Sequence, residues 1–427
     1  MATLLPQPRY LVLWVCLVGA GVGLAALVNL AVDPYGIYNF SLKHGLNEIK
    51  PHAGANGMMA KAYQVQRVKP RTLVLGNSRA EVGFNPESRA WPQALQPVYN
   101  LALPGTGPIT SLRYLEHATA IKRPATVVLG IDFMDFLVRE DAGPYRAEGK
   151  SLPMERRLLV TRSGRPNPDY LQQRVEDFSA TVLSLDALIH SISTVNAQHT
   201  RYPTDLTERG FNPMRDYEGI AKREGYYAMF RQRDQENVRA YLRRPNNIYA
   251  GEKRNSPQLE VLRRIIAVCQ GQNAELQIVI YPYHAHLLEI FHEAGLWPVF
   301  EEWKRALARI SAEGNRSRHA SRVQLWDFSG YNAISAEPVP EPVDRKTATH
   351  WYWEAGHFKS ELGDVMLQRM FAEPDRLMDA AIGVKLTPEN VEQEIQRIRQ
   401  QRAWYQTTYN REALMMRELV DMTRGSR

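Results

Sequence analysis

The sequence has few cysteines, no dense run of basic residues and no internal repeat or low-complexity segment. The two cysteines, Cys16 and Cys269, lie far apart, and Cys16 falls within a long apolar run, so neither a disulfide nor a cysteine-based metal site is expected. Lysine and arginine give a net charge of +7 but are spread along the chain, which argues against a nucleic-acid-binding segment. We expect no cofactor. The positive charge suits an anionic surface or polymer without identifying one.

The sequence is long and apolar enough for a sizeable hydrophobic core. It has 427 residues, of which 44% are hydrophobic. A chain of this length accommodates one large domain with insertions or two modest domains.

One long apolar run lies near the N-terminus. Residues 11–32 read LVLWVCLVGAGVGLAALVNLAV, interrupted only by Asn29, and about 20 such residues suffice to cross a bilayer. Arg9 precedes the run and Asp33 follows it, so the positive-inside tendency predicts a cytoplasmic segment at residues 1–10 and an extracytoplasmic remainder. A cleaved signal peptide is the alternative, but no small-x-small cleavage site clearly follows the run.

Apolar segments alternate with helix-like segments beyond a connecting stretch at residues 33–69, which we interpret as a linker. The alternation predicts an α/β domain at residues 70–372 with a doubly wound, mostly parallel, five-stranded sheet of the flavodoxin-like kind. The expected strands are Thr72–Leu75, Val98–Leu101, Thr126–Ile131, Leu276–Tyr281 and Val323–Phe328. The expected helices between and after them are Ile109–Ile121, Pro257–Cys269, Val299–Ile310 and Glu361–Phe371.

Two further segments stand outside this alternation. Residues 137–256 form an insertion with one clearly apolar helix near Phe178–Ile192. Its aromatic and arginine residues either pack on the sheet or form a lid or groove wall suited to a sugar or anionic polymer (Tyr226, Tyr227, Phe230, Arg231 and Arg233). Residues 373–427 form a helical extension, whose helix is expected to begin at Thr387-Pro388 and to continue to about Met422.

Ser78 is the candidate nucleophile. It follows the first expected strand in the turn Gly76-Asn77-Ser78, and the carboxyl ends of parallel strands are where open α/β sheets carry their sites. The alternative is that Ser78 only caps the next helix. The second strand ends in the loop from Asn100 to Gly107, in which Gly105 offers an unobstructed backbone N–H as an oxyanion donor. An ordinary Gly/Pro loop is the alternative there.

His357 is the candidate general base, and Glu354 is the acid that would orient its ring. His357 lies just before the last expected helix, where a serine nucleophile of such a fold needs its base. Asp132, at the end of the third strand, either bonds the Ser78 turn or contacts substrate, although a carboxylate cannot donate to an oxyanion unless it is protonated.

Two more imidazoles, His284 and His286, follow the fourth strand and are expected to line the same site. A His-x-His pair also raises the possibility of a metal, but the spacing reveals no further ligands. We therefore expect no metal.

At these residues the chain resembles the SGNH/GDSL hydrolase superfamily, over about residues 70–372. Gly76-Asn77-Ser78 resembles the nucleophile block, Asn100–Gly105 the glycine block, Gly130–Asp132 the block with an oxyanion-hole asparagine, and Glu354–His357 the Asp-x-x-His block. Asp132 departs from the usual asparagine, and Glu354 from the more frequent aspartate.

The resemblance is strongest to membrane-anchored extracytoplasmic members that act on acyl groups of surface polysaccharides. It implies a single-pass protein of the bacterial inner membrane with its C-terminal domain in the periplasm. The implied activity is that of a serine O-acyltransferase or O-acyl esterase of an exopolysaccharide or other envelope glycan, working through Ser78, His357 and Glu354. It implies Asn77, Asn100, Gly105 and Asp132 as oxyanion or substrate residues. His284 joins them because it follows the fourth strand.

An integral membrane protein that exports acyl groups is a further implied partner. The other hypothesis is a catalytically silent component of a polysaccharide-assembly complex, which keeps the sheet as a binding platform. The departure at Asp132 favours that hypothesis.

Overall fold

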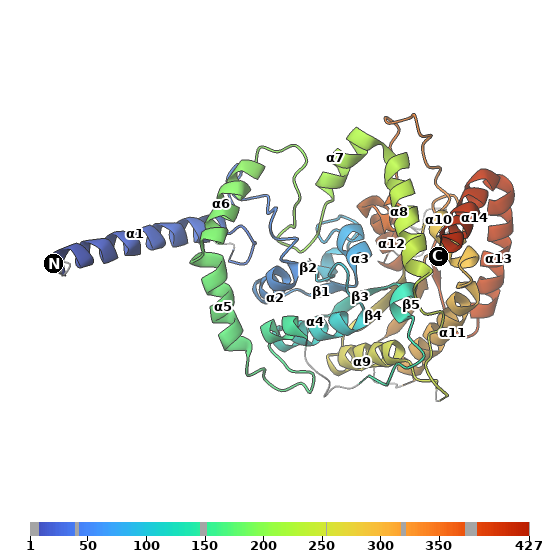
Figure 1. The fold of residues 1–427 in the computed structure, drawn as a ribbon. Coiled ribbons are helices and arrows are strands. Elements are labelled where there is room, and N and C mark those ends of the chain that lie inside the picture. The colour runs from blue at the N-terminus through green and yellow to red at the C-terminus, as the bar shows by residue number, and fades with distance from the viewer. Residues whose placement is uncertain are drawn as a thin grey trace.

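The architecture is that of a computed structural model, which describes residues 8–38, 42–145, 152–252, 254–316, 322–371 and 382–426. Residues 1–7 of the expected cytoplasmic segment, residues 1–10, lie outside these ranges, and residues 8–10 begin the first helix. The chain forms an α/β domain around one mixed sheet, and a long apolar helix, α1 (Pro8–Val32), projects from one side of it (Figure 1).

The central sheet has six strands where five were expected. Their order is β2 (Val98–Asn100), β1 (Thr72–Leu75), β3 (Thr126–Ile131), β4 (Glu275–Ile280), β5 (Val323–Asp327) and β8 (Val384–Lys385). The first five are parallel, as their unbroken apolar runs indicate, because both faces of such strands are buried. The additional strand, β8, pairs antiparallel with β5. It contributes only two residues, which is too short for a recognisable apolar run.

Helices lie on both sides of the sheet (Figure 1). The helices α4 and α9 pack against each other, as do α3 and α12. The helices around the sheet are α2 (Gly57–Val68), α3 (Ser78–Gly83), α4 (Pro108–Ile121), α9 (Pro257–Gly271), α10 (Ala285–Glu293), α11 (Trp297–Gly314) and α12 (Ser360–Phe371).

The segment interpreted as a linker, residues 33–69, contributes to the core through α2. Lys61 of α2 is fully buried, and its Nζ atom lies 2.8 Å from Oε1 of Glu81 in α3. The linker prediction is therefore wrong for residues 57–68. The apolar pattern of α2 is incomplete, because Lys61 occupies a buried position on the helix and is paired with Glu81. The sequence pattern therefore did not indicate a buried helix.

The insertion is largely helical, as expected. It contains α5 (Tyr170–Val182), α6 (Leu185–Ala197), α7 (Arg215–Glu224) and α8 (Tyr226–Tyr241). The single helix expected near Phe178–Ile192 is two helices, because the chain bends by 57° between α5 and α6. Ser184 caps α6 at this bend by accepting a hydrogen bond from the backbone N–H of Ala187, 3.0 Å away.

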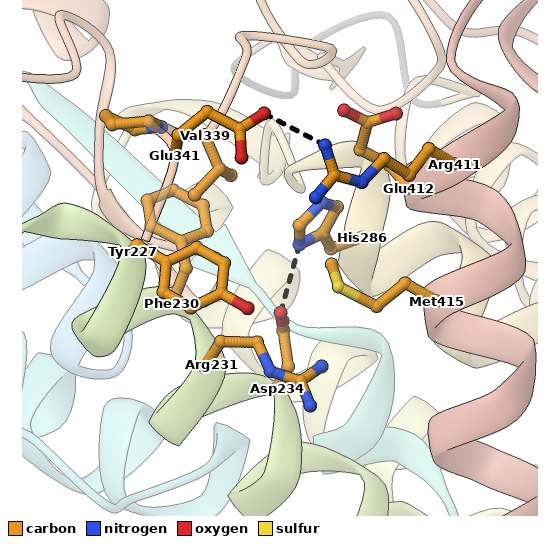
Figure 2. Close-up of a pocket in the computed structure, with 11 residues that line it drawn as sticks. Tyr227, Phe230, Arg231, Asp234, His286, Val339, Glu341, Arg411, Glu412 and Met415 are labelled. Atoms are coloured by element: carbon orange, nitrogen blue, oxygen red, sulfur yellow. Dashed lines mark hydrogen bonds and ion pairs between the residues drawn. The ribbon is translucent and has the colours of Figure 1, made fainter. Parts of the chain in front are cut away.

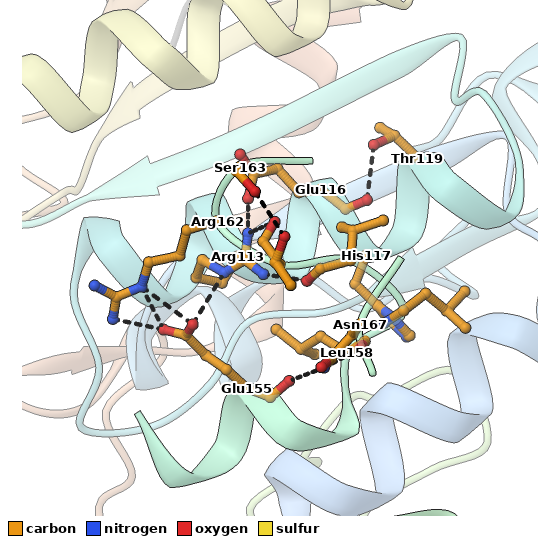
Figure 3. A network of polar contacts seen from close by, with 12 residues as sticks. Arg113, Glu116, His117, Thr119, Glu155, Leu158, Arg162, Ser163 and Asn167 are labelled. Carbon is orange, nitrogen blue, oxygen red and sulfur yellow. Dashed lines mark hydrogen bonds and ion pairs between the residues drawn. The ribbon is translucent and has the colours of Figure 1, made fainter. Parts of the chain in front are cut away.

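A buried polar network fastens the start of the insertion to α4 (Figure 3). The Arg113 side chain is fully buried, forms ion pairs with Glu116 and Glu155, and donates to the backbone carbonyl of Thr161 at 3.2 Å. His117, one helical turn after Arg113 in α4, accepts a hydrogen bond at Nδ1 from the backbone N–H of Leu159, 3.0 Å away. Side chains of α4 thus fix the first part of the insertion.

The C-terminal extension forms two helices, not the single helix expected from Thr387 to about Met422. The first, α13, runs from Val391 to Thr408, and the second, α14, from Asn410 to Gly425. Asn390 takes the cap position, and its Oδ1 atom accepts a hydrogen bond from the backbone N–H of Thr387. The break falls at Tyr409, whose backbone leaves the helical region.

Candidate active site

The turn after β1 presents Ser78. Gly76 has a φ of +143°, and a Cβ atom there would lie 2.5 Å from Oη of Tyr281 and 3.0 Å from the carbonyl oxygen of Gly130, so only glycine fits. Asn77 then caps α3 by accepting a hydrogen bond from the backbone N–H of Arg79, 3.1 Å away. Asn77 therefore takes the cap role, and the half-buried Ser78 begins α3 with its hydroxyl at the carboxyl end of the sheet.

A short hairpin carries the candidate base and acid. It consists of β6 (Tyr352–Glu354) and β7 (His357–Phe358), in which Glu354 and His357 are directly paired. Within the hairpin, Oε2 of Glu354 accepts a hydrogen bond from the backbone N–H of Gly356 at 2.6 Å. The ring atom Nδ1 of His357 is hydrogen-bonded to Oε1 of Glu354. The other ring nitrogen, Nε2, lies 2.8 Å from Oγ of Ser78.

Close packing holds this hairpin against α3. Gly83, at the end of α3, would place a Cβ atom 2.0 Å from the ring of Phe358. A Cβ atom at Gly363 of α12 would in turn lie 1.8 Å from the carbonyl oxygen of Gly83. Arg79 adds a hydrogen bond of 2.6 Å from its Nε atom to the backbone carbonyl of Gly356. The residues next to Ser78 and His357 therefore fix their separation.

Glu354 is buried, with an exposed fraction of 1%, and faces two cationic or polar partners besides His357. Nε of Arg233, from α8, lies 3.2 Å from Oε1 of Glu354. Burial alone would raise the pKa of Glu354, but the imidazole of His357, the Arg233 guanidinium and the Gly356 N–H together lower it. The carboxylate therefore stays ionised, and it can hold the imidazole ring of His357 in one orientation.

Arg233 is the functional contact that the sequence interpretation missed. Arg233 was grouped with the residues of the insertion that suit a sugar, and no motif or spacing joins it to Glu354. Of the other four, Phe230 is buried against His284 and His286, and Tyr226 accepts a hydrogen bond from Nζ of Lys359 at 2.9 Å. Tyr227 and Arg231 line a pocket described below.

Asp132 lies next to the Ser78 turn but acts as an acceptor. Its carboxylate forms an ion pair with Arg79 and accepts hydrogen bonds from Oη of Tyr283 at 3.1 Å and the backbone N–H of Met134 at 3.2 Å. Both carboxylate oxygens are thus engaged as acceptors inside the protein, so Asp132 presents no donor to an oxyanion. The Asn77 amide also donates towards carboxylates, to Asp132 at 3.4 Å and to Asp135 at 3.2 Å.

The loop after β2 runs beside the Ser78 turn, as the parallel pairing predicts. The backbone N–H of Leu103 donates to the carbonyl of Gly76 at 2.9 Å, which extends the pairing past the end of β1. Gly105 is exposed, has a φ of +68° and has open space where a side chain would begin. A Cβ atom at Gly107 would lie 3.7 Å from Asp135, so the loop borders the partner of Asn77.

Asn100 stabilises the chain that follows the Ser78 turn. It is fully buried, and its Nδ2 atom donates to the backbone carbonyls of Ala80 and Phe84, both at 2.8 Å. Its Oδ1 atom accepts from the backbone N–H of Ala102 at 3.1 Å. Both ends of the amide are therefore used inside the protein, and Asn100 positions α3 instead of facing a substrate.

His284 and His286 lie in a different environment from the one expected. His284 is buried, with Nε2 3.0 Å from the carbonyl oxygen of Glu337, and burial together with His286 lowers its pKa well below the ordinary value. Nδ1 of His286 lies 3.0 Å from Oδ2 of Asp234 in a pocket whose walls come partly from α14 (Figure 2). Within the described ranges, neither imidazole is hydrogen-bonded to Ser78, His357 or Glu354.

The described residues contain no group of three or more His, Cys, Asp or Glu side chains arranged to hold a metal ion. Among the site residues named from the sequence, the structure brings together Ser78, His357 and Glu354, and it keeps Asn77, Asp132 and the Gly105 loop beside them. No protein-family model matches the sequence, and no curated protein matches it significantly.

Proposed function

We propose that the chain is a membrane-anchored serine O-acyltransferase or O-acyl esterase of the SGNH type, acting on an exopolysaccharide or another envelope glycan. The observation that carries the proposal is the continuous bonding from Oγ of Ser78 to His357, at 2.8 Å, and from His357 to the ionised Glu354. A serine hydroxyl is a weak nucleophile until a base accepts its proton, and this arrangement supplies that base with an orienting acid.

The reaction has two halves. Nε2 of His357 takes the proton from Ser78, and Oγ of Ser78 attacks the acyl carbonyl carbon. The tetrahedral intermediate collapses as His357 gives that proton to the leaving oxygen, which leaves an acyl group on Ser78. Water in an esterase, or a sugar hydroxyl in a transferase, then gives its proton to His357 and attacks the acyl carbon. This second tetrahedral intermediate collapses as His357 returns the proton to Oγ of Ser78, which frees the serine.

Two backbone donors would hold the oxyanion. The N–H of Ser78, at the start of α3, and the N–H of Gly105, in the open loop beside it, are the groups assigned to this role. Asp132 contributes no third donor, since its carboxylate oxygens are engaged by Arg79, Tyr283 and the N–H of Met134. That feature supports the alternative function, a catalytically silent platform in a polysaccharide-assembly complex.

The anchor is the apolar helix α1, which is long and apolar enough to cross a membrane. The C-terminal end of α1 packs against the domain, which argues against cleavage of this helix as a signal peptide. Nζ of Lys50 donates to the carbonyls of Val32 and Asp33, both at 2.8 Å, and Val32 is buried. The charges flanking α1 favour a periplasmic domain in the bacterial inner membrane. A membrane-integral acyl exporter would be a suitable donor partner, and the net positive charge suits an anionic glycan.

A fluorophosphonate probe tests the proposal. It should modify Ser78 in the full-length chain, and the modification should be lost in both Ser78→Ala and His357→Ala. Ser360→Ala, a change of another serine near the hairpin, should label like the unmodified chain. Absence of labelling in the unmodified chain, or equal labelling with and without His357, favours the silent platform.

A further inference from the structure

The helices α5 and α6 have their polar faces inside and their apolar faces outside. On α5, the buried side chains are Gln173, Asp177, Thr181 and Val182, of which three are polar. The large exposed side chains follow helical spacing along the opposite faces of the two helices, with exposed fractions of 43–74%: Leu171, Val175, Phe178, Leu185, Ile189 and Ile192. This arrangement is the reverse of an ordinary surface helix, and water is a poor solvent for such a face.

The buried polar face of α5 is hydrogen-bonded to the domain. Asp177 accepts hydrogen bonds from Nε and Nη2 of Arg157 at 2.7 and 2.8 Å and from Oη of Tyr63 at 2.7 Å. Thr181 lies 2.8 Å from Oη of Tyr38. The helix α5 cannot turn its apolar face inward without breaking these bonds, so its exposed stripe is fixed in place.

The pair is attached to the base of α1. Nδ2 of Asn29, the one polar residue of the apolar run, donates to the carbonyl of Val182 at 2.9 Å, and its Oδ1 atom accepts from Oγ of Ser191 at 2.8 Å. Figure 1 shows α1 leaving the domain at the junction of α5 and α6, which lie across its base.

The length of α1 sets the depth of this junction. Residues 10–24 are free of protein contact along most of their surface, and at ~1.5 Å per residue they reach only about 22 Å. The hydrocarbon core of a bilayer is about 30 Å thick, so a spanning helix that begins near Tyr10 needs residues to about Asn29. Asn29 is hydrogen-bonded to both α5 and α6. The junction therefore falls at the membrane boundary.

We propose that α5 and α6 lie in the interface of the bilayer that α1 crosses, with their apolar stripe among the lipids. The inference adds an orientation to the proposed function and rests on its membrane anchor. Two helices across the base of α1 would hold the domain in one orientation, where a single helix would let it rotate. A lipid occupant is favoured over a protein because the stripe is continuous with α1, which is itself exposed to lipid.

The pair is too short to be a second span. Each helix has 13 residues, or about 20 Å, and the 57° bend between them prevents a straight crossing. The buried Asp177, with its arginine partner, would also lie in the hydrocarbon region if α5 crossed the bilayer.

Site-directed spin labelling of the full-length chain tests the inference. Cys16 and Cys269 are first replaced by alanine, and single cysteines then carry a nitroxide at Ile189 in α6, at Leu17 in α1 and at Met422 in α14. The protein is placed in nanodiscs of phosphatidylethanolamine and phosphatidylglycerol without any other protein. Accessibility of each label to oxygen, which concentrates in lipid, is compared with accessibility to a water-soluble nickel chelate.

The labels at Leu17 and Ile189 should favour oxygen, and the label at Met422, which is 68% exposed and far from α1, should favour the nickel chelate. If Ile189 behaves like Met422 while Leu17 favours oxygen, the interfacial placement is wrong and the anchor stands. If Ile189 is shielded from both reagents, a second copy of the chain covers the stripe and the lipid assignment is wrong. Exposure of both Leu17 and Ile189 to the chelate overturns the anchor and the inference together, while probe labelling of Ser78 separately tests catalysis.

Discussion

Nε2 of His357 lies 2.8 Å from Oγ of Ser78, although 279 positions separate the two residues in the sequence. The end of β1 fixes Ser78, and the β6–β7 hairpin fixes His357. Gly83 and Phe358 bring the two elements together, since any larger residue at position 83 would collide with the aromatic ring. The pairing of Ser78 with His357 therefore depends on the packing of Gly83 against Phe358 as well as on their own hydrogen bond.

Replacing Ser78 with alanine should reduce release of acetate from an aryl acetate at least ~10³-fold, because no other hydroxyl of the described chain is bonded to His357. The thermal midpoint should stay nearly unchanged, since Ser78 is half-buried and makes no structural ion pair. Steady-state hydrolysis and a thermal melt measure the two quantities. Undiminished turnover in this variant would contradict the assigned nucleophile, and Ser360→Ala serves as the matched control.

Arg233→Met should move the acid limb of the pH–rate profile to higher pH. Arg233 is one of the groups that lower the pKa of Glu354, and the active state needs that carboxylate ionised. Removing the cation raises the pKa of Glu354, so the carboxylate takes up a proton and activity is lost at a higher pH as the pH falls. The measurement is kcat/KM for aryl acetate hydrolysis across pH.

The control for this change is Arg231→Met, which removes a nearby arginine of the same helix that lines the other pocket. It should leave the acid limb in place. An equal shift in both variants would mean that the effect comes from overall charge and not from the contact with Glu354.

Gly83→Ala should destabilise the protein by roughly 1–3 kcal/mol and reduce activity, because the new methyl group would overlap the Phe358 ring beside His357. Gly271→Ala is a matched change, since Gly271 also ends a helix, α9, and has open space around it. That variant should be neutral or more stable by up to about 1 kcal/mol. Equal thermal midpoints for the two variants would contradict the close packing of α3 on β7.

His117 should make stability depend on pH between about 6.5 and about 4. Burial lowers its pKa from the ordinary 6.5 to about 4, with Arg113 adding to the effect. In this window the His117 side chain binds a proton in the unfolded chain but not in the folded chain. The free energy of unfolding is therefore highest above the window and decreases as the pH falls through it. The expected loss is on the order of 3 kcal/mol.

Thermal midpoints at several pH values test this. His117→Gln should give a shallower loss between these limits than the unmodified chain, because glutamine has no titrating proton. His350→Gln, at an exposed histidine, should retain the full slope. A slope that is unchanged in His117→Gln would assign the acid sensitivity to other groups.

Two strands with continuous apolar runs were predictable to the residue, and the other three parallel strands to within one residue at each end. Thr72–Leu75 and Thr126–Ile131 have the expected ends, because burial on both faces leaves an unbroken run that polar or glycine residues terminate. The strand β8 and the helix α2 were not predictable, since the former has two residues and the latter buries Lys61 against Glu81. Their stability comes from tertiary partners that the local pattern does not reveal.

The grouping of Ser78 with His357 and Glu354 was predictable. Ser78 follows the first strand, His357 precedes the last helix of the α/β domain, and the acid and the imidazole are only three residues apart. The pairs Arg79–Asp132 and Arg233–Glu354 were not predictable, because they join residues far apart in sequence with no shared motif. The resemblance assigned Asn100 to the oxyanion or substrate residues, and its place after the fourth strand assigned His284 to them. In the structure, their polar atoms are instead hydrogen-bonded to backbone carbonyls inside the protein.

The most direct test of the account is detection of an acyl-enzyme. The full-length chain is mixed with an aryl acetate, quenched in acid within the first turnover, digested and analysed by peptide mass spectrometry. We predict one acetyl group on the peptide that contains Ser78, and none in His357→Ala. An acetyl group on another residue, or none under conditions in which aryl acetate is consumed, would contradict the assignment of Ser78 as the nucleophile.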